Sequence, residues 1–126
     1  QKRLSESPLN TYAPVVQWST VRLLLVMTFI LSLKTQASNF TNAFAQAELK
    51  TPVYIQTPAK YHRPEWGPSP VLKLNRSLYG QAEAPRLWYE KLKKGLEDRG
   101  FTASKVDPCM FLSPKIICVQ YVDDCL

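Results

Sequence analysis

One apolar run dominates the pattern of hydrophobic and polar positions. Residues 21–33 read VRLLLVMTFILSL, and their uninterrupted apolar part is shorter than the ~20 residues that a membrane span needs. The run therefore predicts a buried helix that is apolar nearly all round and needs cover on several sides. Ser19 or Thr20 is expected to cap it by accepting hydrogen bonds from free backbone N–H groups. We predict neither a membrane partner nor a signal peptide, since no clear small-residue cleavage site follows the run.

The clearest local element is a helix predicted over Pro85–Arg99. Its first residue is a proline, which suits a first helical turn because the missing N–H has no partner there in any case. Gly100 suits the position just past the end, where a left-handed backbone is favoured. Trp88, Leu92 and Leu96 recur every four residues and are expected to form the buried stripe of this helix.

Shorter segments complete the predicted elements. A second helix is expected over Thr41–Leu49, where Ala43, Phe44 and Ala47 share one face, and Pro52 is expected to follow its end. Apolar or alternating segments are expected to form strands, and proline-rich segments loops. The predicted strands cover residues 34–39, 53–56, 71–74, 109–112 and 116–121, with an irregular arm over 1–14 and an extended loop over 57–70.

Composition and charge narrow the class of protein. The 126 residues suit one domain, and 45% hydrophobic and 11% aromatic residues exclude a wholly disordered polar chain. The net charge is +6, but residues 106–126 hold one basic and three acidic residues. Asp123 and Asp124 are adjacent and follow a basic middle region. This pattern is consistent with a metal-dependent enzyme acting on phosphates, but taken alone it favours a turn that simply contains two aspartates.

The cysteines and the single histidine predict no metal centre. Cys109, Cys118 and Cys125 form no C-x-x-C pair, and His62 is distant from them in sequence. This spacing favours neither a zinc site nor a disulfide framework. Cys118 and Cys125 are interpreted as small core residues in a reducing compartment. For His62, in a loop-like stretch, a structural role is favoured over a catalytic one.

Six segments, taken together, point to one family. In order they are TYAPVVQWSTVRLLL, FTNAFAQAEL, VYIQTP, KLNRSLYGQAEAPRLWYEKL, GFTASKVDPCMF and YVDD, and they cover nearly all of residues 11–126. Their order and spacing resemble the reverse transcriptase of copia-type LTR retrotransposons, as found in Gag–Pol polyproteins. The motif YVDD alone would be weak, but SLYG followed by APRLWY at the centre makes the resemblance specific.

The resemblance implies a fold and a domain organisation. The fold would be α+β, part of the palm and fingers of a right-hand polymerase, with helices packed on one face of a small antiparallel sheet. Residues 1–10 would be an irregular N-terminal arm and residues 11–126 a partial reverse transcriptase domain. The thumb and RNase H are expected to be absent, with the chain truncated after YVDD, unless a longer polyprotein supplies the missing polymerase segments.

The resemblance also implies a function. A reverse transcriptase is an RNA-directed DNA polymerase, so the reaction would be two-metal nucleotidyl transfer to a primer 3′-hydroxyl. The expected partners are an RNA or DNA template–primer and dNTPs, and the expected location is intracellular, in cytoplasm or nucleus. The family cofactor is a pair of Mg²⁺ ions roughly 3.5–4 Å apart.

The catalytic carboxylates can be carried over position by position. Asp123 matches the principal metal ligand of a tight β-turn, and Asp124 its less direct neighbour. The other expected catalytic aspartate is replaced by Asn39, whose amide brings no negative charge. Losing one anionic ligand should weaken Mg²⁺ binding severely. The alternative function is therefore a catalytically dead transposon remnant that at most binds nucleic acid.

Other residues match segments around the template and nucleotide. The resemblance assigns nucleotide or template contacts to Tyr79, Gly80, Pro85, Arg86, Tyr121 and Val122. Phosphate contacts are expected from Lys73, Arg76, Lys91 and Lys94, although such lysines can also form an ordinary solvated face. A third hypothesis, an unrelated basic structural protein, predicts that Asn39 and Asp123 lie far apart. A palm-like fold instead places them facing each other across adjacent strands.

Overall fold

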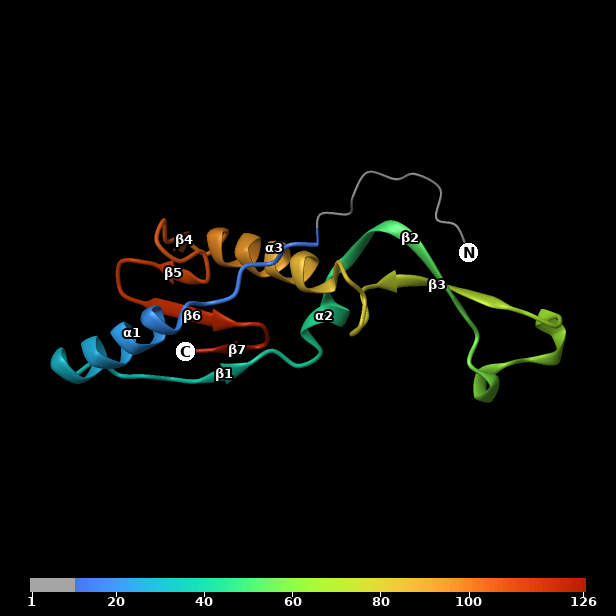
Figure 1. The fold of residues 1–126 in the computed structure, drawn as a ribbon, viewed down its shortest axis with the longest axis horizontal. Coiled ribbons are helices and arrows are strands. Elements are labelled where there is room, and N and C mark those ends of the chain that lie inside the picture. The colour runs from blue at the N-terminus through green and yellow to red at the C-terminus, as the bar shows by residue number, and fades with distance from the viewer. Residues whose placement is uncertain (1–10) are drawn as a thin grey trace.

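Two antiparallel sheets organise the part of the chain that the structure, a computed structural model, describes (Figure 1). This part is residues 11–126, so the predicted arm at residues 1–10 lies outside the described residues. The helices are α1 Trp18–Ile30, α2 Ala43–Gln46 and α3 Ala84–Glu97, with short 3₁₀ turns η1 Ala59–Tyr61 and η2 Pro64–Trp66. The strands are β1 Ser38–Asn39, β2 Glu48–Gln56, β3 Val71–Arg76, β4 Thr102–Ala103, β5 Met110–Leu112, β6 Ile117–Tyr121 and β7 Asp124–Cys125. The architecture is thus α+β with few helices, as predicted.

The larger sheet is a simple meander with one added edge strand. 

Its strands run β1-β7-β6-β5-β4, so β4 to β7 follow the chain order and β1 joins from a distant part of the sequence. The smaller sheet is a two-stranded ribbon of β2 and β3 that projects away from the rest of the molecule in Figure 1. Its pairing shifts register between Glu48 and Val53. Pro52 lies in that irregular stretch, as expected for a residue without a backbone N–H.

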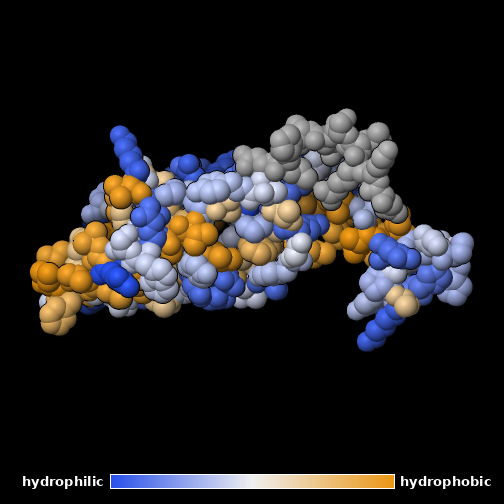
Figure 2. Space-filling view, in the orientation of Figure 1, coloured by the Kyte–Doolittle hydropathy of each residue, from blue (hydrophilic) through white to orange (hydrophobic). Residues whose placement is uncertain are grey.

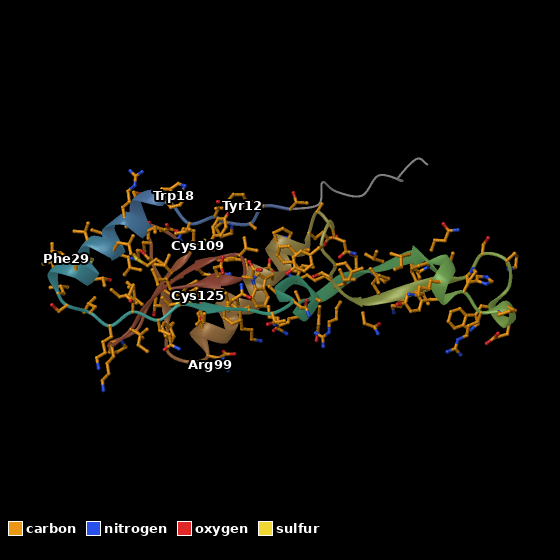
Figure 3. All side chains as sticks on the ribbon, turned by 90° about the horizontal axis from the view of Figure 1, so that it is seen from below. Tyr12, Trp18, Phe29, Arg99, Cys109 and Cys125 are labelled. Carbon is orange, nitrogen blue, oxygen red and sulfur yellow. The ribbon has the colours of Figure 1, made fainter. Side chains whose placement is uncertain are left out.

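Helices cover both faces of the larger sheet, so the expectation of helices on one face is wrong. Figure 3 shows the sheet between α1, with Trp18 above it, and the end of α3 near Arg99, below it. Side chains alternate across a strand, which puts Val119 and Tyr121 on the face of α1, where they line a hollow with Trp18. Gln120 points to the other face, where its amide and the Trp88 indole of α3 donate to the same carbonyl. The sheet is a middle layer because both of its faces are apolar enough to need cover.

The predicted helix at residues 85–99 is confirmed, as α3. Leu87, Trp88 and Leu92 are buried in one cluster with Ala43 and Ala47 of the α2 region. Gly100 has a φ of 84°, the left-handed conformation predicted just past the helix end. An apolar stripe on one side and lysines on the other explain why this helix packs as its sequence predicts.

The helix α1 forms where the apolar run predicts it, but two expectations about it are wrong. Its N-cap residue is Gln17, and neither this residue nor Ser19 or Thr20 caps it through a side chain, since the Thr20 hydroxyl donates to Asp107 instead. Thr20 and Leu24 are its only buried residues, so the helix is not covered on several sides. Figure 2 shows its apolar surface as an orange patch at one end of the molecule. No helix within residues 11–126 is long and apolar enough to cross a membrane.

The other differences come from tertiary contacts that local patterns do not contain. The helix predicted over 41–49 is only four residues long, because the backbone N–H of Ser77 donates to the Ala47 carbonyl at 3.0 Å and β2 begins at Glu48. The strand predicted over 34–39 shrinks to its last two residues, those that meet β7. The short strand β4 was not predicted, and it forms by pairing with β5.

Candidate active site

The candidate site is the tight turn between β6 and β7. Tyr121 pairs with Asp124, which leaves Val122 and Asp123 as a two-residue loop. Val122 has a φ of 54°, in the left-handed region that a β-branched side chain rarely adopts. A strained residue persists only where surrounding contacts hold it, so the contacts of this turn define how its aspartates are presented.

Three hydrogen bonds from outside the loop hold its backbone. The indole Nε1–H of Trp88 donates to the Val122 carbonyl at 2.6 Å, and the Gln120 side-chain amide donates to the same oxygen at 2.7 Å. The backbone N–H of Phe40 donates to the Asp123 carbonyl at 2.7 Å. Trp88 and Phe40 also pack edge to face, with ring centroids 5.4 Å apart. Helix α3 and strand β1 are therefore both fastened to the turn.

The strand β1 brings Asn39 beside the two aspartates. Asn39 pairs with Asp124 across β1 and β7, and its Nδ2–H donates to Asp124 Oδ1 at 3.1 Å. The position expected to carry the third carboxylate thus lies next to the turn, on an adjacent strand, and not in a remote part of the fold. The side-chain contact is with Asp124 and not with Asp123, the residue assigned as principal ligand.

This donor set fits a pair of Mg²⁺ ions poorly. Two adjacent carboxylates and one neutral amide supply less negative charge than two divalent ions need for tight binding. Within residues 11–126, no three side chains of His, Cys, Asp and Glu gather in a group that could hold a metal ion. The Asn39 amide also donates to an Asp124 oxygen that a cation would otherwise use.

The segment matched to the nucleotide lies at the start of α3. Gly80 has a φ of 90°, and a Cβ added there would meet nothing within 4 Å, so the backbone conformation alone explains the glycine. The Tyr79 ring packs on Phe44 with centroids 4.5 Å apart. Pro85 lines a small hollow of about 50 Å³ that also contacts Tyr121 and Val122 of the turn. Pro85 therefore lies beside the turn, and Tyr79 is linked to it through Phe44, which lines the same hollow.

Arg86 is already held by carboxylates of its own helix. Its guanidinium contacts Glu90 at 2.6 Å and Glu83 at 4.0 Å, and its side chain is largely buried. Glu90 in turn accepts from Lys50 at 2.7 Å. That hydrogen bond from Lys50 and the charge of Arg86 lower the pKa of the Glu90 carboxyl, against the opposing effect of partial burial. This ion-pair network joins β2 to α3 and occupies Arg86.

The residues expected to contact phosphates do not form one group. Arg76 is paired with Glu48 at 2.8 Å within the ribbon of β2 and β3. Lys73 is exposed on the same ribbon, whereas Lys91 and Lys94 are exposed on α3. Exposed lysines on two separate elements can contribute to a diffuse positive electrostatic field. Such a field attracts phosphates less specifically than a phosphate-binding pocket would.

Sequence reasoning missed the residues that anchor the site. Trp88 was interpreted correctly as core, but its hydrogen bond to the turn was not foreseen, and Gln120 was not singled out. Asp107 is buried and accepts from the Thr20 hydroxyl at 2.6 Å and from the backbone N–H groups of Gln17 and Cys109 at 2.9 Å each. Burial raises the pKa of Asp107, but these hydrogen bonds outweigh it and lower the pKa overall. An isolated aspartate before a proline gives no sequence signal of this role.

Two cysteines lie directly behind the turn. The Sγ atoms of Cys118 in β6 and Cys125 in β7 are 2.7 Å apart. This contact lowers the pKa of Cys125 to about 7 and raises the pKa of Cys118. All three cysteines of the chain are free thiols, and Cys109 is buried.

The whole chain matches one protein family. The family described as Reverse transcriptase (RNA-dependent DNA polymerase) matches residues 1–126. The chain therefore belongs to the reverse transcriptase family. No solved structure matches the chain.

Its curated relatives are transposon polyproteins. A Retrovirus-related Pol polyprotein from transposon TNT 1-94 of Nicotiana tabacum is 30% identical over 126 residues, covering 91% of this chain and 9% of the relative. One from transposon RE1 of Arabidopsis thaliana is 32% identical over 121 residues, covering 93% and 8%. The Transposon Ty1-H Gag-Pol polyprotein of Saccharomyces cerevisiae is 28% identical over 123 residues, covering 91% and 6%. The resemblance to copia-type retrotransposon reverse transcriptases is confirmed, and the chain spans less than a tenth of these relatives.

Proposed function

We propose that this chain is the part of an RNA-directed DNA polymerase that carries the catalytic turn. In this proposal the five-stranded sheet corresponds to the palm, and the ribbon of β2 and β3 belongs to the fingers. The observation that supports it is the pairing of β1 with β7, which puts Asn39 beside Asp123 and Asp124. The proposed partners are a template–primer duplex and dNTPs, as the family membership suggests.

We further propose that nucleotidyl transfer is lost in this chain. The family reaction depends on Mg²⁺, a hard cation that prefers carboxylate oxygens. Asn39 supplies an amide where a carboxylate is expected, and this amide donates to Asp124. Both effects lower the affinity of the turn for a divalent cation. The chain would then retain nucleic-acid binding without synthesis.

The proposed binding of nucleic acid rests on exposed cations. Lys73, Lys91 and Lys94 are exposed, while Arg76 and Arg86 are neutralised by glutamates of the same chain. Binding by such scattered lysines is independent of sequence and weakens steeply as salt concentration rises. The contribution of Arg76 and Arg86 is therefore expected to be smaller than that of the three lysines.

The test restores the missing charge with Asn39→Asp. Without metal, the third carboxylate should repel Asp124 and lower the melting temperature. With Mn²⁺, the variant should bind at least about tenfold more tightly than the unmodified chain, as measured by isothermal titration and by recovery of the melting temperature. Asn42→Asp is the matched control, because Asn42 is also exposed and lies three positions along the chain from Asn39.

Primer extension on an RNA template separates the two proposals. Incorporation by Asn39→Asp, and none by the unmodified chain or Asn42→Asp, would support both. Robust Mg²⁺-dependent extension by the unmodified chain would overturn the loss of activity. Equal Mn²⁺ affinity in all three proteins would overturn the assignment of the turn as a metal site.

A further inference from the structure

Cys118 and Cys125 form a close pair of thiols that the polymerase site does not use. They lie on the neighbouring antiparallel strands β6 and β7. Cys125 pairs with Gln120, and Cys118 lies two residues before Gln120, on the same face of β6. Their sulfur atoms are 2.7 Å apart. Cys109 is also a buried free thiol and provides a comparison within the same chain.

The geometry of the pair is close to that of a covalent bond. A disulfide has sulfur atoms about 2.05 Å apart, so the two thiols need to approach by only about 0.7 Å. Both residues line a hollow of about 890 Å³ that is also lined by residues of α1 and of the loop between β5 and β6, and Cys125 is only partly buried. A small oxidant can therefore reach the pair without the strands separating.

We propose that Cys118 and Cys125 are a reversible redox modification site, at which a hydroperoxide produces an intramolecular disulfide. The proposal rests on the placement of the two sulfurs and is independent of the proposed polymerase function. It differs from the interpretation of the two residues as small core residues, because a core cysteine needs no second sulfur in contact.

The reaction balances with one equivalent of hydrogen peroxide. The Cys125 sulfur attacks a peroxide oxygen, the O–O bond breaks, and one water leaves as the sulfenic acid forms. The Cys118 sulfur then attacks the sulfenic sulfur, the S–O bond breaks, and a second water leaves as the disulfide forms. The two thiols lose two electrons and two protons, and the peroxide oxygens are reduced to water. A dithiol reductant reverses the step by thiol–disulfide exchange.

The disulfide would tie β7 to β6 directly behind the turn of Val122 and Asp123. The backbone already pairs Val119 with Leu126 in both directions, at 2.8 and 2.9 Å. A covalent link inside this hairpin restrains its unfolded state more than its folded state. Oxidation is therefore expected to raise the melting temperature of the chain.

Tryptic mapping tests the proposal on the unmodified chain. Trypsin cleaves after Lys105 and Lys115, so residues 116–126 contain both cysteines of the pair and residues 106–115 contain Cys109. The native chain is treated with hydrogen peroxide, its free thiols are alkylated, and the peptides are weighed. We expect the 116–126 peptide to escape alkylation and to be about 2 Da lighter than the reduced, unalkylated peptide, because the two thiol hydrogens are lost. The peptide with Cys109 should be alkylated as a free thiol.

The same oxidation in concentrated guanidinium separates a preformed pair from chance pairing. The unfolded chain should give disulfides that include Cys109, whereas the native chain should give only the pair within residues 116–126. Alkylation of both Cys118 and Cys125 after native treatment would overturn the proposal. So would oxidation to sulfinic or sulfonic acid without disulfide, or the same mixture of pairings in native and unfolded chains.

Three cysteine variants test the proposal separately, so the test does not depend on the folding of any one of them. Cys118→Ser and Cys125→Ser should each abolish the loss of about 2 Da and the rise in melting temperature, because one sulfur is missing. Cys109→Ser should retain both effects. A rise in melting temperature on oxidation of Cys118→Ser would assign the effect to another site and overturn the proposal.

Discussion

The helices α1 and α3 cover opposite faces of one sheet, but different interactions attach them. α3 buries Leu87, Trp88 and Leu92, and its indole donates to the turn that carries the aspartates. α1 buries only Thr20 and Leu24, and its clearest attachment is the contact between Thr20 and Asp107. One helix is held by apolar packing, and the other chiefly by a polar anchor at its first turn.

This difference shows what an apolar sequence does and does not specify. α3 has apolar residues on one side only, so its pattern defines the face that packs. α1 is apolar nearly all round, so its pattern defines no face, and Phe29 and Ile30 are 87% and 70% exposed. In Figure 3 Phe29 lies at the far end of α1, away from the sheet. Burial depends on the surface that a neighbour offers and not on apolar content alone.

The largest expected effect is that of Trp88→Ala. Its ring is 3% exposed, so truncation removes buried contacts as well as a hydrogen bond. We expect the free energy of unfolding to fall by about 3–5 kcal/mol. The matched variant in the other helix, Trp18→Ala, removes a ring that is 75% exposed and should change the free energy by less than about 0.5 kcal/mol. Urea denaturation followed by circular dichroism measures both.

A milder substitution isolates the hydrogen bond from the packing. Trp88→Phe keeps an aromatic ring but removes the Nε1–H donor. The Val122 carbonyl still accepts from Gln120, so the expected loss is only about 1 kcal/mol. Equal losses from Trp88→Ala and Trp18→Ala would show that the two helices are attached alike and would refute the comparison.

Much of the region around α3 could be predicted from the sequence because its signals are local. The proline at the start, the glycine at the end and the four-residue apolar spacing together define the helix. The pairing of Asn39 with the turn could not come from local pattern, since 85 residues separate it from Asp124. The family resemblance supplied that contact, and the register then identified Asp124 as the partner.

There are physical reasons why the region around α1 could not be predicted from the sequence. Whether Thr20 caps its own helix or bonds elsewhere depends on a carboxylate 87 positions away, in Asp107. A hydroxyl can form a hydrogen bond with either partner, and the local sequence does not show which of the two bonds is more favourable. The four-residue α2 shows the same limit, because backbone contacts with Ser77 end a helix that the sequence pattern would continue.

The second expected effect is that of Asp107→Asn. The amide keeps the shape of the carboxylate but loses its charge and turns one acceptor into a donor. The amide oxygen can replace only one of the two carboxylate oxygens, so at least one of the three groups that donate to Asp107 loses its acceptor, and the expected loss in the free energy of unfolding is about 2–3 kcal/mol. Asp98→Asn is the control, since Asp98 is exposed at the end of α3 and should change the free energy by less than about 0.5 kcal/mol.

Acid provides an independent check of the Asp107 anchor. Its pKa is lowered in the folded chain, so its stabilising effect is complete above the ordinary carboxyl pKa near 4 and is lost as pH falls through the folded pKa. The difference in stability between the unmodified chain and Asp107→Asn should therefore shrink below about pH 4. A difference that stayed constant under acid would show that the carboxylate charge contributes nothing to holding α1.

The smallest expected effect is that of Phe29→Ala, at the exposed end of α1. The ring is 87% exposed, so truncation removes few contacts, and alanine favours the helix slightly more than phenylalanine does. The free energy of unfolding should change by less than about 0.5 kcal/mol in urea denaturation. Phe111→Ala, at a residue that is 0% exposed, is the contrasting variant and should cost about 3–5 kcal/mol. A loss from Phe29→Ala as large as that from Phe111→Ala would mean that another surface covers α1 in solution. Apolar packing would then hold both helices, and the contrast between them would disappear.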